Sequence, residues 1–397
     1  MADTRRNILL IMAVFALEPV PFGAWLALIP YVKETLGLDK AQLALALLGM
    51  PIALIPSLSL ASRLVVRIGP RRLLAAGFAV QAVLVFLPLL AFNQLTLFLA
   101  LACFGVFVAI LQVALNVYAG QFEKQTGRII MNRCHGFWAL GLTAGSFVIV
   151  LTAGLPPIVA LALPTFLSAA LGIWCAFGLI RLAAEQHGKP PARRSLAAMP
   201  AALFIIAAYA LASSMTEGAM ADWAAIYLAE RLPDGAGRAG IAVTIFAGFL
   251  AAGRFVGDAA KVRFGVVALA RATVACAIAG LLLLILPLPL SFAYLGFALT
   301  GLGASVGYPL AVSAVAALDD TYEGANIATL SMITVIGFLV GPPLIGFLAD
   351  TFSLRVGLAA LLPGLCVGFV LASYLAVGDS GASRNESDAD LLNRGDS

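Results

Sequence analysis

The chain contains twelve continuous apolar runs of 20 or more residues, and this feature limits its possible folds most strongly. A helix needs ~20 mainly apolar residues to cross the hydrocarbon core of a bilayer. The approximate spans are residues 8–30, 41–62, 72–91, 95–118, 135–154, 157–180, 200–228, 239–258, 267–287, 291–317, 326–348 and 355–377. Because lipid satisfies no backbone polar group, and barrel strands would alternate in polarity, we expect helices. We therefore predict an all-α polytopic membrane protein with twelve transmembrane helices.

The composition excludes several other classes of protein. Hydrophobic residues make up 62% of the chain and charged residues 11%, whereas a soluble domain carries about 25% charged residues. The five cysteines are an odd number and lie in or beside apolar runs, which argues against a secreted disulfide scaffold. With two histidines, His135 and His187, and no Cys/His set at metal-ligand spacing, we expect neither an enzyme nor a bound metal or cofactor.

The basic residues predict the orientation of the chain in the membrane. If the N-terminus is cytoplasmic, 19 of the 24 Lys and Arg residues fall on the cytoplasmic side. The five exceptions are Lys33, Lys40, Arg231, Arg238 and Arg355. Because cytoplasmic loops carry an excess of Lys and Arg, we expect both termini to be cytoplasmic, in a bacterial inner membrane. Arg5 and Arg6 precede an apolar run that is longer than that of a signal peptide, so we expect an uncleaved first helix.

A polar, basic, proline-containing segment at 181–198 divides the chain almost in half. We interpret 181–198 as a cytoplasmic linker between a six-helix bundle at 1–180 and a second at 199–378. The tail at 379–397 is rich in Asp, Ser, Asn and Gly and is expected to be disordered.

The two halves resemble each other at an offset of 196–199 residues. Arg67 and Gly69 correspond to Arg263 and Gly265, after the second span of each half. Trp25 corresponds to Trp223, and Gly127 to Gly324. Repeats related by an axis along the membrane normal are typical of transporters with six plus six helices.

Several segments resemble the major facilitator superfamily, and within it the bacterial branch of YbjJ-like proteins and MosC-like, rhizopine-type permeases. They are GAWLALIPYVKETLGL (23–38), LNVYAGQFEKQTGRIIMNRCHG (115–136), EGAMADWAAIYL (217–228), AGRFVGDAAKVRFG (252–265), GLGASVGYPLAVSA (301–314) and FLVGPPLIGFLAD (338–350). The resemblance covers essentially the whole chain. It implies two six-helix bundles around a central cavity and transport by alternating access.

The chain departs from the family pattern at several positions. The superfamily's loop motif appears as SRLVVRIGPRR, in which Val66 replaces the usual Asp and Pro70 a usual basic residue. Val262 replaces the Asp in the second half, and Leu28 stands where this branch often has Arg. The helix-5 motif of drug/proton antiporters is absent from GFWALGLTAGS (136–146), which argues against a drug exporter.

Two carboxyl groups inside apolar spans are the candidates for proton coupling. Glu18 lies ten residues after Ile8, ~15 Å into a core ~30 Å thick. Pro19 and Pro21 follow it and should kink or open the helix. For Glu18, a protonated carboxyl that hydrogen-bonds a neighbouring helix is the structural alternative. Glu217 is the second candidate.

Further polar and aromatic residues are candidates for substrate binding. Gln112 and Asn116 lie one turn apart on one helix face, and interhelical hydrogen bonding is the equal alternative. The full set of substrate candidates is Gln112, Asn116, Tyr209, Ser213, Tyr308 and Trp25. No Lys or Arg is expected near the centre of a span, which favours a neutral or cationic solute.

The candidate gating residues are Asp222, Trp223, Arg67, Arg254, Asp258, Arg263 and His135. Arg254 and Asp258 are four residues apart, so we expect a salt bridge between them. His135 suits either a pH-sensitive or a structural role.

Together these features predict a secondary active transporter, acting as a monomer. We expect proton-coupled symport of a small polar solute, such as a sugar, a polyol or another neutral to cationic compound. The alternative is a proton-coupled antiporter that exports lipophilic compounds or metabolites.

Overall fold

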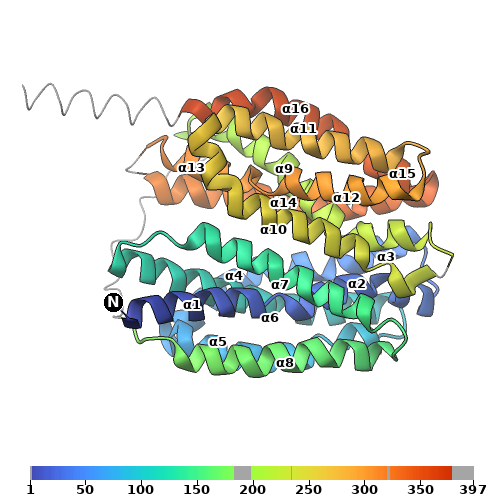
Figure 1. Ribbon diagram of the computed structural model, residues 1–397, viewed down its shortest axis with the longest axis horizontal. Helices are drawn as coiled ribbons and strands as arrows, with labels where there is room; N and C mark the ends of the chain where they lie inside the picture. The colour runs from blue at the N-terminus through green and yellow to red at the C-terminus, as the bar shows by residue number, and fades with distance from the viewer. Residues whose placement is uncertain (1, 183–197, 234, 320–321, 378–397) are drawn as a thin grey trace, which may run out of the picture.

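The computed structural model describes residues 2–182, 198–233, 235–319 and 322–377. In this part of the chain, helices form two bundles that lie side by side (Figure 1), and there is no strand. Twelve helical segments are long and apolar enough to cross a membrane. The prediction of an all-α protein with twelve membrane-spanning helices is therefore confirmed.

The first bundle is built from the N-terminal half of the chain. Its helices are α1 (Ala2–Leu17), α2 (Val20–Thr35), α3 (Lys40–Leu47), α4 (Gly49–Ile68), α5 (Pro70–Leu84), η1 (Leu87–Leu90), α6 (Gln94–Thr126), α7 (Met131–Leu151) and α8 (Pro157–Gly178). Several of these helices run past the predicted spans, and α6 reaches eight residues beyond the predicted end at residue 118.

The second bundle is built from the C-terminal half. Its helices are α9 (Ala201–Ala229), η3 (Gly235–Arg238), α10 (Ile241–Phe264), α11 (Val266–Ile285), α12 (Leu290–Ala304), α13 (Gly307–Ala316), α14 (Glu323–Thr351), α15 (Leu354–Ala359), α16 (Leu362–Leu371) and η5 (Ala372–Val377). Helix α10 extends six residues past its predicted end at residue 258, which moves Arg254 into the interior of the helix.

Several of the described spans divide into shorter helices, and two of them break near their middle. The first divides into α1 and α2 at Glu18 and Pro19, which confirms the break predicted from the prolines. The tenth divides into α12 and α13 at Ser305 and Val306, a break that the sequence interpretation did not include. Broken helices expose backbone carbonyls inside a membrane protein, so both positions are candidates for binding sites.

The two bundles share a local feature that supports an internal repeat. Gly69 ends α4 and precedes α5 with a φ of 84°, and Gly265 ends α10 and precedes α11 with a φ of 80°. Glycine adopts this backbone conformation without the steric cost that a Cβ adds. The match of Gly127 with Gly324 is wrong in structural detail, because Gly127 ends α6 at a φ of 67° whereas Gly324 lies inside α14.

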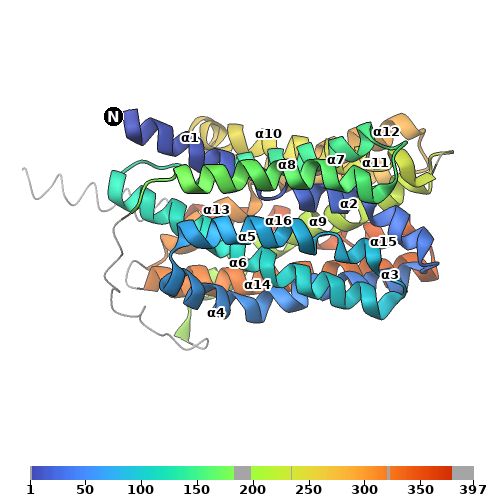
Figure 2. The same cartoon turned by 90° about the horizontal axis from the view of Figure 1, so that it is seen from below.

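Within the described residues, several helix pairs join the bundles, including α4 with α14 and α2 with η3. Helix α7 packs along α10, while α2 packs on α9 and on α10, and α3 packs on α14 (Figures 1 and 2). The contacts of α3 lie at the end of the molecule opposite the N-terminus, where Gly346 of α14 lies against Ala44 of α3. At the same end, Lys40 and Glu230 form a salt bridge of 2.8 Å between the bundles.

The expected linker lies outside the described residues except at 181, 182 and 198, and the expected tail at 379–397 lies wholly outside them. The limits proposed for the two bundles stay predictions.

Candidate functional site

Glu18 lies at the break between α1 and α2 and is almost fully buried, with 2% of its surface exposed. Its Oε2 atom accepts two hydrogen bonds from side chains of other helices. Gln112 Nε2 of α6 donates at 3.1 Å, and Trp138 Nε1 of α7 donates at 2.9 Å. Both donors are neutral, so in the described structure the carboxyl is held by hydrogen bonds and not by a cation.

Close packing of glycines brings α7 to Glu18. Gly141 and Gly145 lie one turn apart on α7, and a Cβ on either would collide with the backbone of the first span, at Ala16 and Val20 respectively. Small residues at this spacing let two membrane helices approach closely. The approach places Trp138, three residues before Gly141, within hydrogen-bond distance of the carboxyl.

Gln81 of α5 completes the surroundings of Glu18. Its Nε2 donates to the backbone carbonyl of Glu18 at 3.1 Å, and Gln81 itself is 1% exposed. The break at Pro19 frees backbone groups, and a buried carbonyl needs a donor. Gln81 supplies it, which stabilises the broken helix at the carboxyl.

Gln112 and Asn116 lie on one face of α6, as the spacing predicts. Asn116 Nδ2 donates to the carbonyl of Gln112 within the same helix, at 2.8 Å. Both side chains are half-buried. The structure brings Gln112 to Glu18, while a substrate contact for either residue stays a prediction.

Arg254 pairs with Glu217 and not with Asp258. Its Nη2 lies 3.0 and 3.2 Å from the two carboxylate oxygens of Glu217 on α9. The expected salt bridge with Asp258 is wrong, because the Arg254 side chain extends to the neighbouring helix. The expectation that no cation lies near the centre of a span is also wrong, since Arg254 is the fourteenth residue of the 24-residue helix α10.

The Arg254 guanidinium also joins the two bundles. It donates to the carbonyl of Ser305, at the break between α12 and α13, at 3.4 Å. It donates to the carbonyl of His135 on α7 at 3.5 Å. One side chain thus contacts three other helical segments, including one of the opposite bundle.

Helices α7 and α10 make two further contacts at the end of the molecule that carries the N-terminus. Asn132 Nδ2 donates to Asp258 Oδ1 at 2.7 Å. The rings of Phe137 and Phe255 meet edge to face with centroids 5.4 Å apart. The structure therefore places Asp258 at the contact between the bundles, with a partner that the sequence interpretation did not identify.

His135 is half-buried at the start of α7. Its ring packs edge to face against Phe15 of α1, with centroids 5.8 Å apart. Together with Arg254 and Asp258 it lines a cavity of about 30 Å³ between the bundles. The aromatic contact favours the structural alternative for the imidazole.

Several predicted site residues are buried in helix packing. Trp25 and Tyr209 are each 1% exposed, Trp223 is 0% exposed, and Ser213 is 4% exposed. Ser213 contacts the break between α12 and α13, where its hydroxyl donates to the carbonyl of Ala304 at 3.5 Å. In this arrangement these four side chains lie within the protein interior, and the substrate and gating roles expected for them stay predictions.

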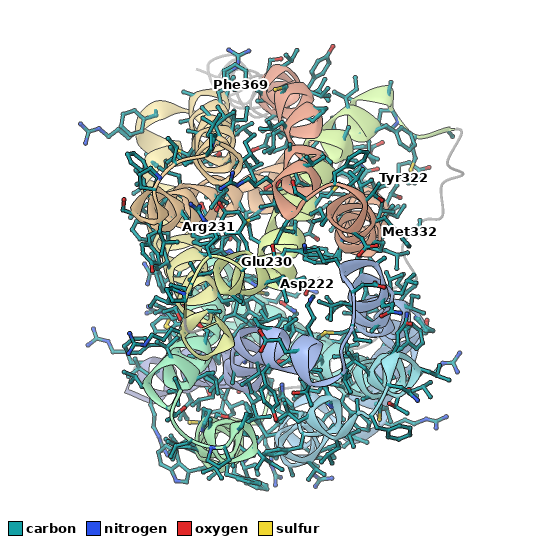
Figure 3. All side chains as sticks on the ribbon, turned by 90° about the vertical axis from the view of Figure 1, so that its right-hand side faces the viewer. Asp222, Glu230, Arg231, Tyr322, Met332 and Phe369 are labelled. Carbon is teal, nitrogen blue, oxygen red and sulfur yellow. The ribbon has the colours of Figure 1, made fainter. Side chains whose placement is uncertain are left out.

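Asp222 and Tyr308 are partly exposed. Asp222 of α9 lies between the two bundles in the view from the end opposite the N-terminus (Figure 3), and its carboxyl makes no hydrogen bond or ion pair with another described residue. The Tyr308 hydroxyl lies 2.8 Å from Ser331 Oγ and so joins α13 to α14.

Arg67 and Arg263, the arginines of the two loop motifs, are exposed at the ends of α4 and α10. The Arg263 guanidinium lies 5.3 Å from the centre of the adjacent Phe264 ring. Neither arginine forms a salt bridge within the part of the chain that the structure describes, so their gating role also stays a prediction.

The sequence interpretation missed Trp138 and Gln81. Gln81 is a glutamine within an apolar span, and an amide in lipid needs a hydrogen-bond partner. The argument that singles out Gln112 therefore applies to Gln81 as well. The sequence interpretation treats Trp138 as an apolar residue, although its indole N–H is a hydrogen-bond donor. Within the residues described, no three His, Cys, Asp or Glu side chains come together as metal ligands would.

No family model matches the chain. An uncharacterized MFS-type transporter of Yersinia pestis is 30% identical over 355 residues, which cover 88% of this chain and 91% of the relative. The membrane protein MosC of Rhizobium meliloti is 28% identical over 380 residues, which cover 90% of this chain and 86% of MosC.

Solved structures show the same fold. A crystal structure of the nucleoside transporter NupG superposes with a TM-score of 0.67 at 15% identity, over 96% of this chain and 99% of that chain. A bacterial homolog of the human lysosomal transporter Spinster, inward-facing and occupied, superposes with a TM-score of 0.61 at 15% identity, over 94% of this chain and 96% of that one. The chain belongs to the major facilitator superfamily and is a membrane-spanning secondary transporter.

Proposed function

We propose that the chain is a proton-coupled symporter that imports a small polar solute across the bacterial cytoplasmic membrane by alternating access. The observation that carries this proposal is the Glu18 carboxyl, buried at a helix break and bonded by two neutral donors. The basic residues support cytoplasmic termini, because 19 of 24 would then lie on that side.

The surroundings of Glu18 suit a group that takes up and releases a proton. Burial penalises the charged carboxylate, while the Gln112 and Trp138 N–H groups stabilise it. A neighbouring Arg or Lys would hold the group permanently charged, and none is bonded to it in the described structure. The surroundings of Glu18 therefore suit both the protonated and the charged form of its carboxyl.

We infer the substrate class from polar groups on α6 of the first bundle and on α9 and α10 of the second. Gln112 and Asn116 offer amides, and Asp222 offers a carboxyl that no other described residue uses. The charge of Arg254 is balanced by Glu217 at 3.0 Å, so this pair adds no net positive charge. These groups favour a neutral or cationic solute with hydroxyl or amino groups.

Alternating access would act through the contacts between the bundles. Asn132 with Asp258 and Arg254 with the His135 carbonyl join α7 to α10, whereas Lys40 with Glu230 closes the opposite end. The Asn132–Asp258 hydrogen bond and the Lys40–Glu230 ion pair join side chains that water reaches, so these two contacts suit a joint that opens and closes. Rocking of one bundle against the other is the motion that we propose.

The test has two steps, both on the full chain. A thermal-shift screen of sugars, polyols, amines and organic acids first identifies a compound that raises the melting temperature, as binding to the folded state requires. That compound is then added to proteoliposomes that contain a pH-sensitive dye. Symport acidifies the lumen, whereas exchange of the solute for protons makes it alkaline.

Glu18→Gln should abolish the pH change but keep the thermal shift, because the variant removes the proton site and leaves the solute site. Glu34→Gln is the matched control, since Glu34 is an exposed carboxyl at the end of α2. An alkaline signal would favour the antiporter alternative. An acid signal of normal size in the Glu18→Gln vesicles would remove Glu18 from the coupling mechanism.

A further inference from the structure

A second cavity lies apart from the bundle contact, within the first bundle, and no proposed transport step uses it. It has a volume of about 770 Å³ and lies between the ends of α4, α5, α6 and α8. Volumes of 300–1,000 Å³ are typical of pockets that bind small molecules. Among the residues that the structure describes, its lining contains Arg71, Arg72 and Arg181 and no Asp or Glu.

Hydrogen bonds hold one of these arginines in place. Arg71 Nε donates to the carbonyl of Ala176 at 3.1 Å, and its Nη2 donates to the carbonyl of Phe177. A guanidinium has five N–H groups, so several remain for a ligand. Arg72 and Arg181 make no hydrogen bond or ion pair with the residues that the structure describes, and both are exposed.

The start of α5 adds backbone donors to the same cavity. Gly69 precedes the helix without a side-chain cap, and no acidic residue lies in the first turn. Gly69, Pro70 and the two following arginines all line the cavity. The first amides of a helix lack partners inside the helix and attract anions, so they reinforce the arginines.

An apolar surface continues from this cavity along α8. Phe177 lines the cavity and is 61% exposed. It ends a row of exposed apolar side chains at helical spacing on one face of α8, namely Leu163, Leu167, Leu171, Trp174 and Phe177. The row rises over fourteen residue steps, or about 21 Å, which exceeds half of a bilayer core of ~30 Å.

We propose that this cavity binds an anionic phospholipid. The phosphate lies against Arg71, Arg72 and Arg181 at the start of α5, and an acyl chain lies along the exposed face of α8. Arginine suits a phosphate because its planar N–H groups match the geometry of the oxygens. Basic pockets between membrane helices bind anionic lipid headgroups in the same way. The apolar row favours a lipid over a free phosphate ion, which has no apolar part.

The test measures lipid binding to the purified full chain by native mass spectrometry, with phosphatidylglycerol as the probe and phosphatidylcholine as the neutral comparison. We expect phosphatidylglycerol to bind at least tenfold more tightly. The double variant Arg72→Gln/Arg181→Gln should bind it roughly thirtyfold more weakly, since each arginine near an anionic surface contributes about fivefold. The control Arg63→Gln/Arg128→Gln removes the same charge from two exposed arginines that do not line the cavity, and it should change binding by less than threefold.

Equal binding of the two lipids, or an equal loss in the control variant, would overturn the proposal. Inorganic phosphate at 10 mM, the chosen competitor concentration, distinguishes the source of the anion. Displacement of phosphatidylglycerol by phosphate would show a site for free phosphate, whereas retention supports the lipid. If the double variant has a lower melting temperature in phosphatidylcholine, Arg72→Gln alone replaces it, with an expected loss of about fivefold.

Discussion

The contact between Glu217 and Arg254 is open to a quantitative test, because the sequence favours a different partner for the same arginine. The perturbation is a double-mutant cycle of Glu217→Gln, Arg254→Gln and the two combined. One guanidinium nitrogen lies 3.0 and 3.2 Å from the two carboxylate oxygens, and the side chains are 13% and 18% exposed. Such a pair is mostly shielded from water.

The two single variants should differ in their effect on the free energy of unfolding. Removing one partner of a fully buried pair costs about 3–5 kcal/mol, and the residual exposure reduces this to roughly 2–3 kcal/mol for Arg254→Gln. Glu217→Gln should cost less, about 1–2 kcal/mol, because Arg254 keeps the carbonyls of Ser305 and His135 as acceptors. We expect a coupling energy of about 2 kcal/mol, above the ~0.6 kcal/mol typical of a hydrogen bond between membrane helices.

The assay is unfolding by SDS in mixed micelles, followed by the fluorescence of the four tryptophans. The matched control is the cycle of Arg254→Gln with Asp258→Asn, the pair that the four-residue spacing favours. Asp258 is bonded to Asn132 at 2.7 Å instead, so its coupling to Arg254 should not exceed about 0.5 kcal/mol. A larger coupling to Asp258 than to Glu217 would refute the assignment of the ion pair.

Three further outcomes follow from the packing. Trp138→Phe keeps the aromatic ring but removes one of the two donors to Glu18, so it should lower stability by about 1 kcal/mol and reduce solute-driven proton entry into the vesicles; full activity would show that this hydrogen bond is dispensable. Gly145→Ala places a methyl group against the backbone of α2 and should lower the melting temperature in detergent, with a cost of about 1–3 kcal/mol, whereas an unchanged melting temperature would contradict the close approach. Lys40→Gln breaks a partly exposed salt bridge with Glu230 and should cost less than about 1 kcal/mol; a loss that is equally large at high salt would show a different role for Lys40, since salt screens an exposed pair.

The helix breaks illustrate how far the sequence predicts local structure. Pro19 and Pro21 beside Glu18 correctly predict that the first span opens, because proline removes a donor and clashes with the preceding turn. The break at Ser305 and Val306 was not predicted, although Pro309 follows one turn later and, lacking an N–H, cannot bond the Ser305 carbonyl. There the Arg254 side chain of α10 bonds the Ser305 carbonyl, a contact between helices that no local pattern reports.

The hydrogen bonds of the buried polar groups also divide into a part that the sequence predicts and a part that it does not. Glu18 stands out in the sequence because a carboxyl in an apolar run is costly. Its donors, Gln112 and Trp138, come from residues 94 and 120 positions away. Their meeting depends on the glycines that let α7 approach the first span. The spacing of residues within one helix does not predict hydrogen bonds between different helices. For Arg254, that spacing favoured Asp258 as the partner, whereas the structure has Glu217.

The sequence by itself determined the environment of this protein, the number of its spans and the family to which it belongs. The environment and the number of spans depend on the length and apolarity of each segment, which are local and follow from the transfer of side chains and backbone into lipid. The family depends on particular residues in particular segments and on the relative that is 30% identical. The tertiary structure decided which polar groups meet, because hydrogen bonds and ion pairs depend on distances of about 3 Å between different helices. It paired Arg254 with Glu217, gave Glu18 its two donors, and placed three arginines around one cavity of the first bundle.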